Sequence, residues 1–374
     1  MLGKLNLKVF LPNRLRARVE RESGGKNTVV YDVDGNPSIM VVVPCFNVED
    51  LDPRFGSGPH PAFIVAGKVK SEILIGKYQA SLERGLPVSL PNRDPAVRLT
   101  FDGALTHCRA KGPGWHLMTN AEWAAVALLC WKNGYLPRGN TNYGRSSESA
   151  EESGSFHDRF EPKVPHTDAW TLTGSGPASW NHDNTADGIA DLCGNLFEWV
   201  GGLRLMEGEI QTIPHNNAAI NTTDQSPISP AWHAILENGD LMPPGTPGSL
   251  KFDCVSPNTF DQAGAAFLNT EIVNRNDPNL CDDGYASCPF GQLSNKPGVV
   301  APPILMQLAM YPIALGDAAI GGSIWLRNYG ERLPLRGGNF YTQQASGVFT
   351  LDLNARRATR HPPAGFRLAY IGSR

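Results

Sequence analysis

The sequence predicts an α+β protein in which an early strand and two helices precede a long β-rich half. The apolar run IMVVVP at 39–44 is typical of a buried strand. A capping box, TNAE at 119–122, followed by the apolar run 123–131, predicts a helix. Near the C-terminus, apolar residues alternate over 349–353, as in a strand with one buried face. With 39 glycines and 30 prolines, much of the chain is expected to be loop and turn.

The remaining elements follow the same local signals. EILIGKY at 72–78 predicts a second early strand, and 101–110 predicts a helix that Gly112 ends. We expect residues 1–37 to form a peripheral N-terminal arm: an added strand, an oligomer contact or an attachment arm. A segment at about 208–328 is an unusually long insertion, which we expect to be partly ordered and packed beside the C-terminal region.

Composition excludes several functions. A formal net charge of −3 argues against nucleic acid as the main partner, and no run of eighteen apolar residues predicts a membrane span. The N-terminus has a short apolar run before its arginines, the reverse of a secretory signal, so localisation stays open. The seven cysteines form no CxxC pair, although Cys281 and Cys288 could close a small ring.

The segment 188–200, GIADLCGNLFEWV, predicts a turn at Gly194-Asn195 that leads into a strand. Leu196, Trp199 and Val200 are expected to pack inside. Glu198 is expected to be tied to backbone groups or to an arginine, since a buried carboxylate needs partners.

Several motifs carry a resemblance to a known family. They are RGGNF at 336–340 with GFR at 365–367, GIADLCGNLFEWV at 188–200, GWHLMTNAE at 114–122, and EILIGKY at 72–78. On these motifs the chain resembles the formylglycine-generating-enzyme and sulfatase-modifying-factor superfamily. The resemblance implies a C-type lectin fold, with two helices and antiparallel sheets, over residues 38–374.

The C-terminal stretch 335–370 resembles more closely the variable region of proteins diversified by retroelements, through GVFTLDLN at 347–354. Such proteins are mutated at template adenines, chiefly in AAC codons for asparagine. The resemblance places asparagine at nine positions whose residues here are all reachable from AAC by changing adenines: Tyr341, Thr342, Ala345, Asp352, Asn354, Ala355, Thr359, His361 and Pro363. The stretch 339–364 contains no Lys, Glu, Met or Trp, which that route cannot produce.

The resemblance therefore implies a hypervariable ligand-binding protein, displayed on a virion or cell surface or used in host recognition. Its expected ligand-binding residues are Phe340, Tyr341, Thr342, Gln344, Ala345, Ser346, Asp352, Asn354, Ala355, Arg357, Thr359, His361 and Pro363. We expect ten of them to gather on one solvent-facing surface: Phe340, Tyr341, Thr342, Gln344, Ser346, Asp352, Ala355, Arg357, Thr359 and His361. Val348, Phe349, Leu351 and Leu353 should be buried beneath this surface.

The enzymatic activities of the superfamily are argued against. A formylglycine-generating oxidase needs a cysteine pair where this chain has Thr342 and Gly347, and no cysteine follows Cys288. The iron-dependent sulfoxide synthases bring a histidine-rich domain, and none of the nine histidines here forms an HxxxH pair. We therefore expect no enzyme activity and no cofactor.

Metal and partner remain the open points. The superfamily often has a structural calcium, but in the loop 182–188 the twelfth position from Asp183 is Gly194 rather than Glu, which favours a simple Asx-turn. The expected partner is an unknown protein or surface ligand, and the oligomeric state is open. Two alternative functions stay open as well: a divergent enzyme of the superfamily, and a structural phage tail component.

Overall fold

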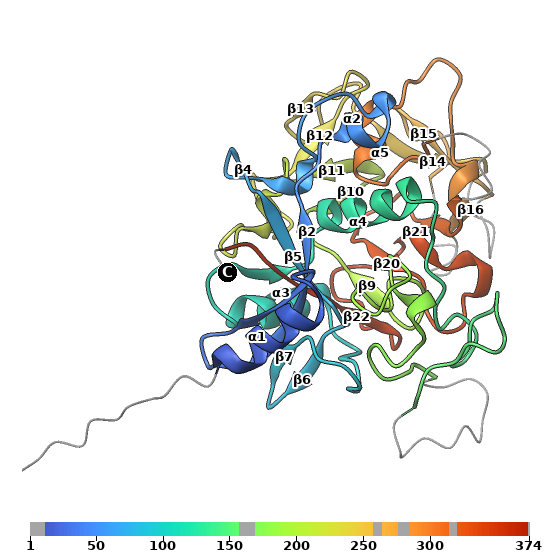
Figure 1. The fold of residues 1–374 in the computed structure, drawn as a ribbon. Coiled ribbons are helices and arrows are strands. Elements are labelled where there is room, and N and C mark those ends of the chain that lie inside the picture. The colour runs from blue at the N-terminus through green and yellow to red at the C-terminus, as the bar shows by residue number, and fades with distance from the viewer. Residues whose placement is uncertain (1–11, 157–168, 257–263, 276–284, 314–319, 373–374) are drawn as a thin grey trace, which may run out of the picture.

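The structure is a computed structural model that describes residues 12–156, 169–256, 264–275, 285–313 and 320–372. These residues form a mixed α+β fold with several sheets (Figure 1). Their α-helices are α1 (Pro12–Glu22), α2 (Val48–Leu51), α3 (Phe101–Ala110), α4 (Asn120–Lys132) and α5 (Pro303–Gln307). α3 and α4 are the two predicted helices, and the structure adds the other three.

A five-stranded antiparallel sheet combines both ends of the chain. Its order is β1 (Asn27–Tyr31), β2 (Pro37–Pro44), β5 (Glu72–Gly76), β23 (Leu368–Tyr370) and β8 (Trp115–Leu117). β2 and β5 are the two predicted early strands. β1 adds an edge strand from the N-terminal residues, and α1 packs on it.

A six-stranded sheet carries the C-terminal segment. Its order is β16 (Ala286–Pro289), β18 (Ser323–Leu326), β21 (Gly347–Leu353), β20 (Leu335–Gly337), β9 (Phe197–Trp199) and β22 (Ala364–Phe366). The pairs β18–β21 and β22–β9 are parallel, so this sheet is mixed, whereas antiparallel sheets were expected. The insertion causes the first of these pairings, because β18 comes from it and runs alongside β21 in the same direction.

The insertion also builds most of a third sheet. Its order is β13 (Leu241–Met242), β12 (His233–Ile235), β11 (Glu209–Thr212), β14 (Lys251–Cys254), β15 (Ala266–Asn269) and β17 (Ser294–Asn295), with β10 (Leu203–Met206) and β19 (Glu331–Arg332) off this path. Two short hairpins complete the strands: β3 (Ile64–Val65) with β4 (Lys68–Val69), and β6 (Ser81–Glu83) with β7 (Leu86–Val88).

Helix α4 lies near the centre, with α5 and the insertion strands above it and β9, β20 and β22 below it in the view of Figure 1. The predicted capping box is confirmed, because the Glu122 amide donates to the Thr119 hydroxyl and the Thr119 amide donates to the Glu122 carboxylate. The indole of Trp123 donates to the carbonyl of Val348 at 2.7 Å, which ties α4 to β21. Within the part of the chain that is described, no helix is long and apolar enough to cross a membrane.

The predicted turn at 194–195 and its strand, β9, are both present. Gly194 has a φ of 70°, and a Cβ there would lie 2.2 Å from the carbonyl oxygen of Asn140, so only glycine fits. The fully buried side chain of Asn195 accepts the Thr171 amide at 2.7 Å and donates to Gln79 at 2.8 Å. These bonds hold the turn rigidly against the core.

Glu198, on β9, is the buried carboxylate for which a partner was expected, and that partner is Arg367. Two nitrogens of the Arg367 guanidinium donate to the two Glu198 oxygens at 2.9 and 2.6 Å, and both side chains are at most 1% exposed. The remaining Arg367 donors reach the carbonyls of Gly76, Lys77 and Ala190. Glu198 belongs to β9 of the six-stranded sheet, and Gly76 belongs to β5 of the five-stranded sheet. The side chain of Arg367 therefore joins the two sheets.

We expect Arg367→Met to lower the free energy of unfolding by roughly 3–5 kcal/mol, because it leaves Glu198 buried and uncompensated. Urea denaturation at pH 7 measures the loss. The double variant Arg367→Met/Glu198→Leu should recover part of it, since no lone charge remains. Arg360→Met, at an exposed arginine of the same segment, is the control and should change stability by less than about 0.5 kcal/mol. Equal effects at Arg367 and Arg360 would contradict the assignment.

Candidate functional site

The predicted variable segment, 335–370, forms β20, β21, β22 and β23 with two loops between the first three of these strands. The prediction of its buried framework is confirmed, because Val348, Phe349, Leu351 and Leu353 are each at most 1% exposed. The polar residues of the segment therefore rest on a close-packed support.

The RGG motif at the start of the segment has a structural role. The guanidinium of Arg336 is fully buried and donates twice to the side-chain oxygen of Asn120, at 3.0 and 2.6 Å. It also reaches two carbonyls at the end of α5, and burial lowers its pKa to about 9. Gly338 has a φ of 82°, and a Cβ there would lie 2.4 Å from the hydroxyl of Ser346. The motif thus fixes the start of the first loop.

The first loop, 338–346, holds itself together by short-range hydrogen bonds. The hydroxyl of Thr342 accepts the Asn339 amide at 2.9 Å and also bonds to the Ser346 hydroxyl. The side chain of Asn339 accepts the Tyr341 amide at 2.9 Å. Tyr341, at 39% exposure, and Gln344 project outward as predicted.

An aromatic cluster lies beneath and beside this loop. The ring of Phe340, only 3% exposed, lies 5.7 Å from Tyr143, 6.3 Å from Trp170 and 5.2 Å from Tyr341 between centroids. Tyr143 and Trp170 are half-buried and come from the segment 140–170, far away in sequence. Sequence reasoning missed both, because no local pattern connects them to the C-terminal stretch.

A second cluster lies on one face of the six-stranded sheet. Trp325 of β18 and Asp352 of β21 are partners in parallel register, so their side chains are neighbours. The ring of Phe197 lies 6.2 Å from Trp325 and 6.2 Å from His361, edge to face in both cases. The Asp352 carboxylate accepts the backbone amide of Asn354 at 2.7 Å. Asp352, Asn354 and His361 are half-buried, and sequence reasoning missed Trp325 and Phe197.

Backbone hydrogen bonds fix the second loop, 354–363, near both of its ends. The carbonyl of Ala355 accepts the amide of Leu333 at 2.9 Å, and the carbonyl of Pro363 accepts the amide of Phe197 at 2.9 Å. Thr359 closes a turn, with its hydroxyl accepting the Arg356 amide at 3.0 Å. Ala355 and Pro363 are buried by these contacts.

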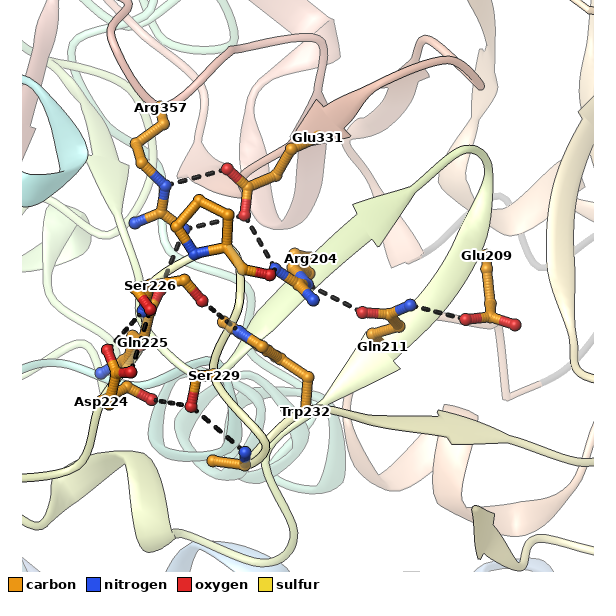
Figure 2. Close-up of polar contacts among 12 residues, drawn as sticks. Arg204, Glu209, Gln211, Asp224, Gln225, Ser226, Ser229, Trp232, Glu331 and Arg357 are labelled. Carbon is orange, nitrogen blue, oxygen red and sulfur yellow. Dashed lines mark hydrogen bonds and ion pairs between the residues drawn. The ribbon is translucent and has the colours of Figure 1, made fainter. Parts of the chain in front are cut away.

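The side chain of Arg357 is committed to the protein itself. Its guanidinium makes a bidentate pair with Glu331, at 2.9 and 2.8 Å, and a third bond to Asp102 at 2.7 Å. A further donor reaches the carbonyl of Gln225 at 2.9 Å, and the charge lies 5.2 Å from the ring centroid of Phe101. Figure 2 shows this guanidinium facing Glu331 and the segment 224–226. Little donor capacity is left for a ligand.

The same network continues into the insertion. Glu331 also accepts from Arg204 at 3.0 Å, and Arg204 donates to Gln211 at 2.8 Å and stacks over Trp232 at 4.5 Å (Figure 2). The loop 224–231 is held by its own serine and aspartate hydrogen bonds, and the Trp232 indole donates to one of its carbonyls at 2.9 Å. The insertion therefore supports the second loop, as expected for a segment packed beside the C-terminal region.

The expected binding surface is thus only partly solvent-facing. Tyr341 and Gln344 are exposed, and the half-buried members are Thr342, Ala345, Asp352, Asn354, Arg357, Thr359 and His361. The expectation of solvent exposure is wrong for Phe340, Ser346 and Ala355, which are 3%, 6% and 7% exposed. Each is buried by contacts described above: an aromatic cluster, a loop hydrogen bond and a strand contact.

Other expected features lie away from this surface. The Asp183 carboxylate accepts the amide and the hydroxyl of Thr185, at 3.0 and 2.9 Å, which is the predicted Asx-turn. Among the described residues, no group of three or more His, Cys, Asp or Glu is placed to hold a metal ion. Cys281 lies outside the described residues, so the Cys281–Cys288 ring stays a prediction.

A cavity of about 300 Å³ lies between the segment 57–64, the insertion and α5. His215 is its one titratable lining residue, and the rest are apolar residues, glycine, serine, threonine and Gln307. This cavity does not bring together the several ionisable groups that an active site would need.

Glu331 provides a test of the Arg357 network. Burial would raise its pKa, but hydrogen bonds and charge from Arg357 and Arg204 outweigh burial and hold the pKa below the ordinary value. A lowered native pKa stabilises the fold above the unfolded pKa of about 4.3, and this stability is lost as pH falls through the native pKa.

We therefore expect Glu331→Gln to cost about 1–3 kcal/mol of unfolding free energy at pH 7 and much less near pH 3. Denaturant titrations of both proteins across this pH range measure the difference. Glu83→Gln, which breaks an exposed pair with Arg93, is the matched control and should cost almost nothing at either pH. A cost at Glu331 that is independent of pH would contradict the ion-pair network.

Comparison with known proteins gives little that is specific. No protein-family model and no curated protein matches the chain. Among solved structures, the chain is similar to the structure of PvdO from Pseudomonas aeruginosa, with 12% identity and a TM-score of 0.31, over 92% of this chain and 97% of that one. A likeness at this level determines neither the fold family nor the function of the chain.

Proposed function

We propose that this chain is a hypervariable ligand-binding protein of the C-type lectin fold, without enzyme activity, whose segment at about 335–370 is diversified by a retroelement. In this proposal the chain binds a protein or another surface ligand in host or surface recognition. The elements held by Arg336 and Arg367, which include α4, β5 and β9, belong to the constant scaffold, and the two loops and Asp352 of β21 carry the variation.

One observation supports the proposal above the others. Of the nine positions reachable from AAC codons, seven are exposed or half-buried: Tyr341, Thr342, Ala345, Asp352, Asn354, Thr359 and His361. The framework residues of β21, namely Val348, Phe349, Leu351 and Leu353, are each at most 1% exposed. A mutator confined to these codons would therefore change mainly accessible side chains and leave the core of β21 intact.

The chemistry of the accessible set also suits binding. Tyr341 offers a large amphipathic ring at small entropic cost, and the short polar residues beside it adapt their hydrogen bonds to a partner. Tyr143 and Trp170 extend this surface with aromatic area from outside the diversified segment. The proposal thus combines constant aromatic anchors with variable polar contacts.

The genetic test is to sequence the DNA that flanks the gene. We expect a near-copy of the segment encoding 335–370, with mismatches confined to adenines of the copy, together with a reverse-transcriptase gene. If the flanking DNA contains neither the near-copy nor the reverse-transcriptase gene, the retroelement part of the proposal is wrong.

A second test uses the protein. Tyr341→Ser, Thr342→Asn and Thr359→Asn are substitutions that adenine changes in AAC codons can supply, and each should alter unfolding free energy by less than about 1 kcal/mol. Leu351→Ala, in the buried framework, should cost roughly 2–5 kcal/mol in the same urea titration. Losses at the loop positions as large as that at Leu351 would contradict a tolerant binding face.

A further inference from the structure

We propose that the face formed by Trp325, Asp352 and Tyr341 takes a cationic group, the ammonium or guanidinium of a lysine or arginine side chain on a protein partner. This inference rests on the proposed function and adds the chemical class that one part of the face recognises. It depends on three observations: aromatic rings around a carboxyl group, incomplete compensation of that carboxyl, and buried acceptors without donors.

Aromatic residues of three elements are connected to Asp352 by strand register, ring contact and charge. Trp325 is its register partner on β18, and Phe197 on β9 approaches Trp325 to 6.2 Å. Burial, and to a smaller extent the charge of Asp352, raise the pKa of Tyr341 on the first loop. Aromatic faces attract cations, most strongly where water is partly excluded, and a carboxylate among them adds direct Coulomb attraction.

The positive charges of two nearby arginines do not fully compensate the burial of the Asp352 carboxyl. Burial raises the pKa of Asp352 to about 6, although Arg327 and Arg332 act to lower it. Arg332 is already used, because it donates to the carbonyls of Tyr329 and Asn354 at 2.9 Å each and stacks 4.2 Å over the Tyr329 ring. Arg327 likewise donates to the Asn354 carbonyl, at 3.3 Å. A further cation would therefore gain from contact with Asp352.

Two acceptors of the second cluster have no donor, one on Asn354, whose backbone amide bonds to Asp352, and one on His361, whose ring contacts Phe197. The side-chain oxygen of Asn354 and the Nδ1 of His361 are buried and have no hydrogen-bond partner within the described ranges. Burial also lowers the pKa of His361, so its ring is neutral at pH 7 and one ring nitrogen can accept. A carboxylate, an amide oxygen and an imidazole nitrogen suit a donor-rich group such as ammonium or guanidinium, and an anion would meet repulsion.

The probes are n-butylammonium and methylguanidinium, with butyrate and butyramide as anionic and neutral counterparts, added to the full-length protein at pH 7.5. The readout is the chemical shift of the Trp325 indole N–H in protein labelled with ¹⁵N-tryptophan. We expect both cations to shift this resonance with millimolar affinity and the counterparts to leave it unchanged.

Asp352→Asn should weaken cation binding about tenfold, as expected for the loss of one carboxylate among aromatic rings. Asparagine keeps an oxygen to accept the Asn354 amide, so the fold is retained. Asp240→Asn, in the exposed β12–β13 turn, is the matched control and should not change the affinity.

The pH dependence gives an independent readout. The groups whose charges act on Asp352 are Arg327 and Arg332, and arginine side chains do not titrate between pH 5 and 8. The other titratable group of the site is His361, whose pKa burial lowers. Asp352 is ionised above its pKa, so cation affinity should be full at pH 7.5 and fall as pH drops through about 6. In Asp352→Asn the fall through about pH 6 should vanish, and only the loss caused by protonation of His361, whose pKa burial lowers, should remain at lower pH.

Binding of butyrate in place of the cations, or no response of Trp325 to any probe, would overturn the inference. These outcomes are separable from failure of the proposed function. A protein ligand whose affinity depends on Tyr341 and Gln344 but does not change in Asp352→Asn would support the binding function and contradict the cation site. A missing template copy would remove the retroelement while cation binding at Asp352 could still be measured.

Discussion

The buried pair of Arg367 and Glu198 is the interaction on which the rest of the structure depends. Two opposite charges removed from water are tolerated only when the geometry is good and the remaining donors are satisfied, and here the guanidinium also reaches carbonyls of three other residues. Those carbonyls belong to the end of β5 and to the segment before the 194–195 turn. A single side chain therefore connects the two sheets with the segment before the 194–195 turn.

The C-terminal segment alternates between buried, tightly packed residues and accessible residues. Arg336 is fixed by buried hydrogen bonds, the glycines after it have no room for a Cβ, and the inward residues of β21 are buried. Between them, Tyr341 and Gln344 are exposed, and substitutions at exposed positions usually change stability little. Arg357 is instructive because it looks like a binding residue in the sequence, yet its donors are consumed by Glu331, Asp102 and Gln225.

The sequence predicted what depends on local patterns. The capping box before α4, the strand at 39–44, the turn at 194–195 and the buried alternation in β21 all follow from a few neighbouring residues. It could not predict that Tyr143 and Trp170 enclose Phe340, because those contacts span more than 150 positions of the chain. The parallel pairing of β18 with β21 was equally hidden, since it is set by how the insertion returns to the sheet.

That parallel pairing limits how the segment can evolve. β21 is hydrogen-bonded on one side to β20 and on the other to β18, so its register is locked along both edges. Adding or deleting one residue would turn Leu351 and Leu353 toward solvent and Asp352 into the core. Insertions and deletions in this strand would therefore disrupt the fold, whereas exchange of its accessible side chain would not. A mutational process that copies a template of constant length is suited to such a scaffold.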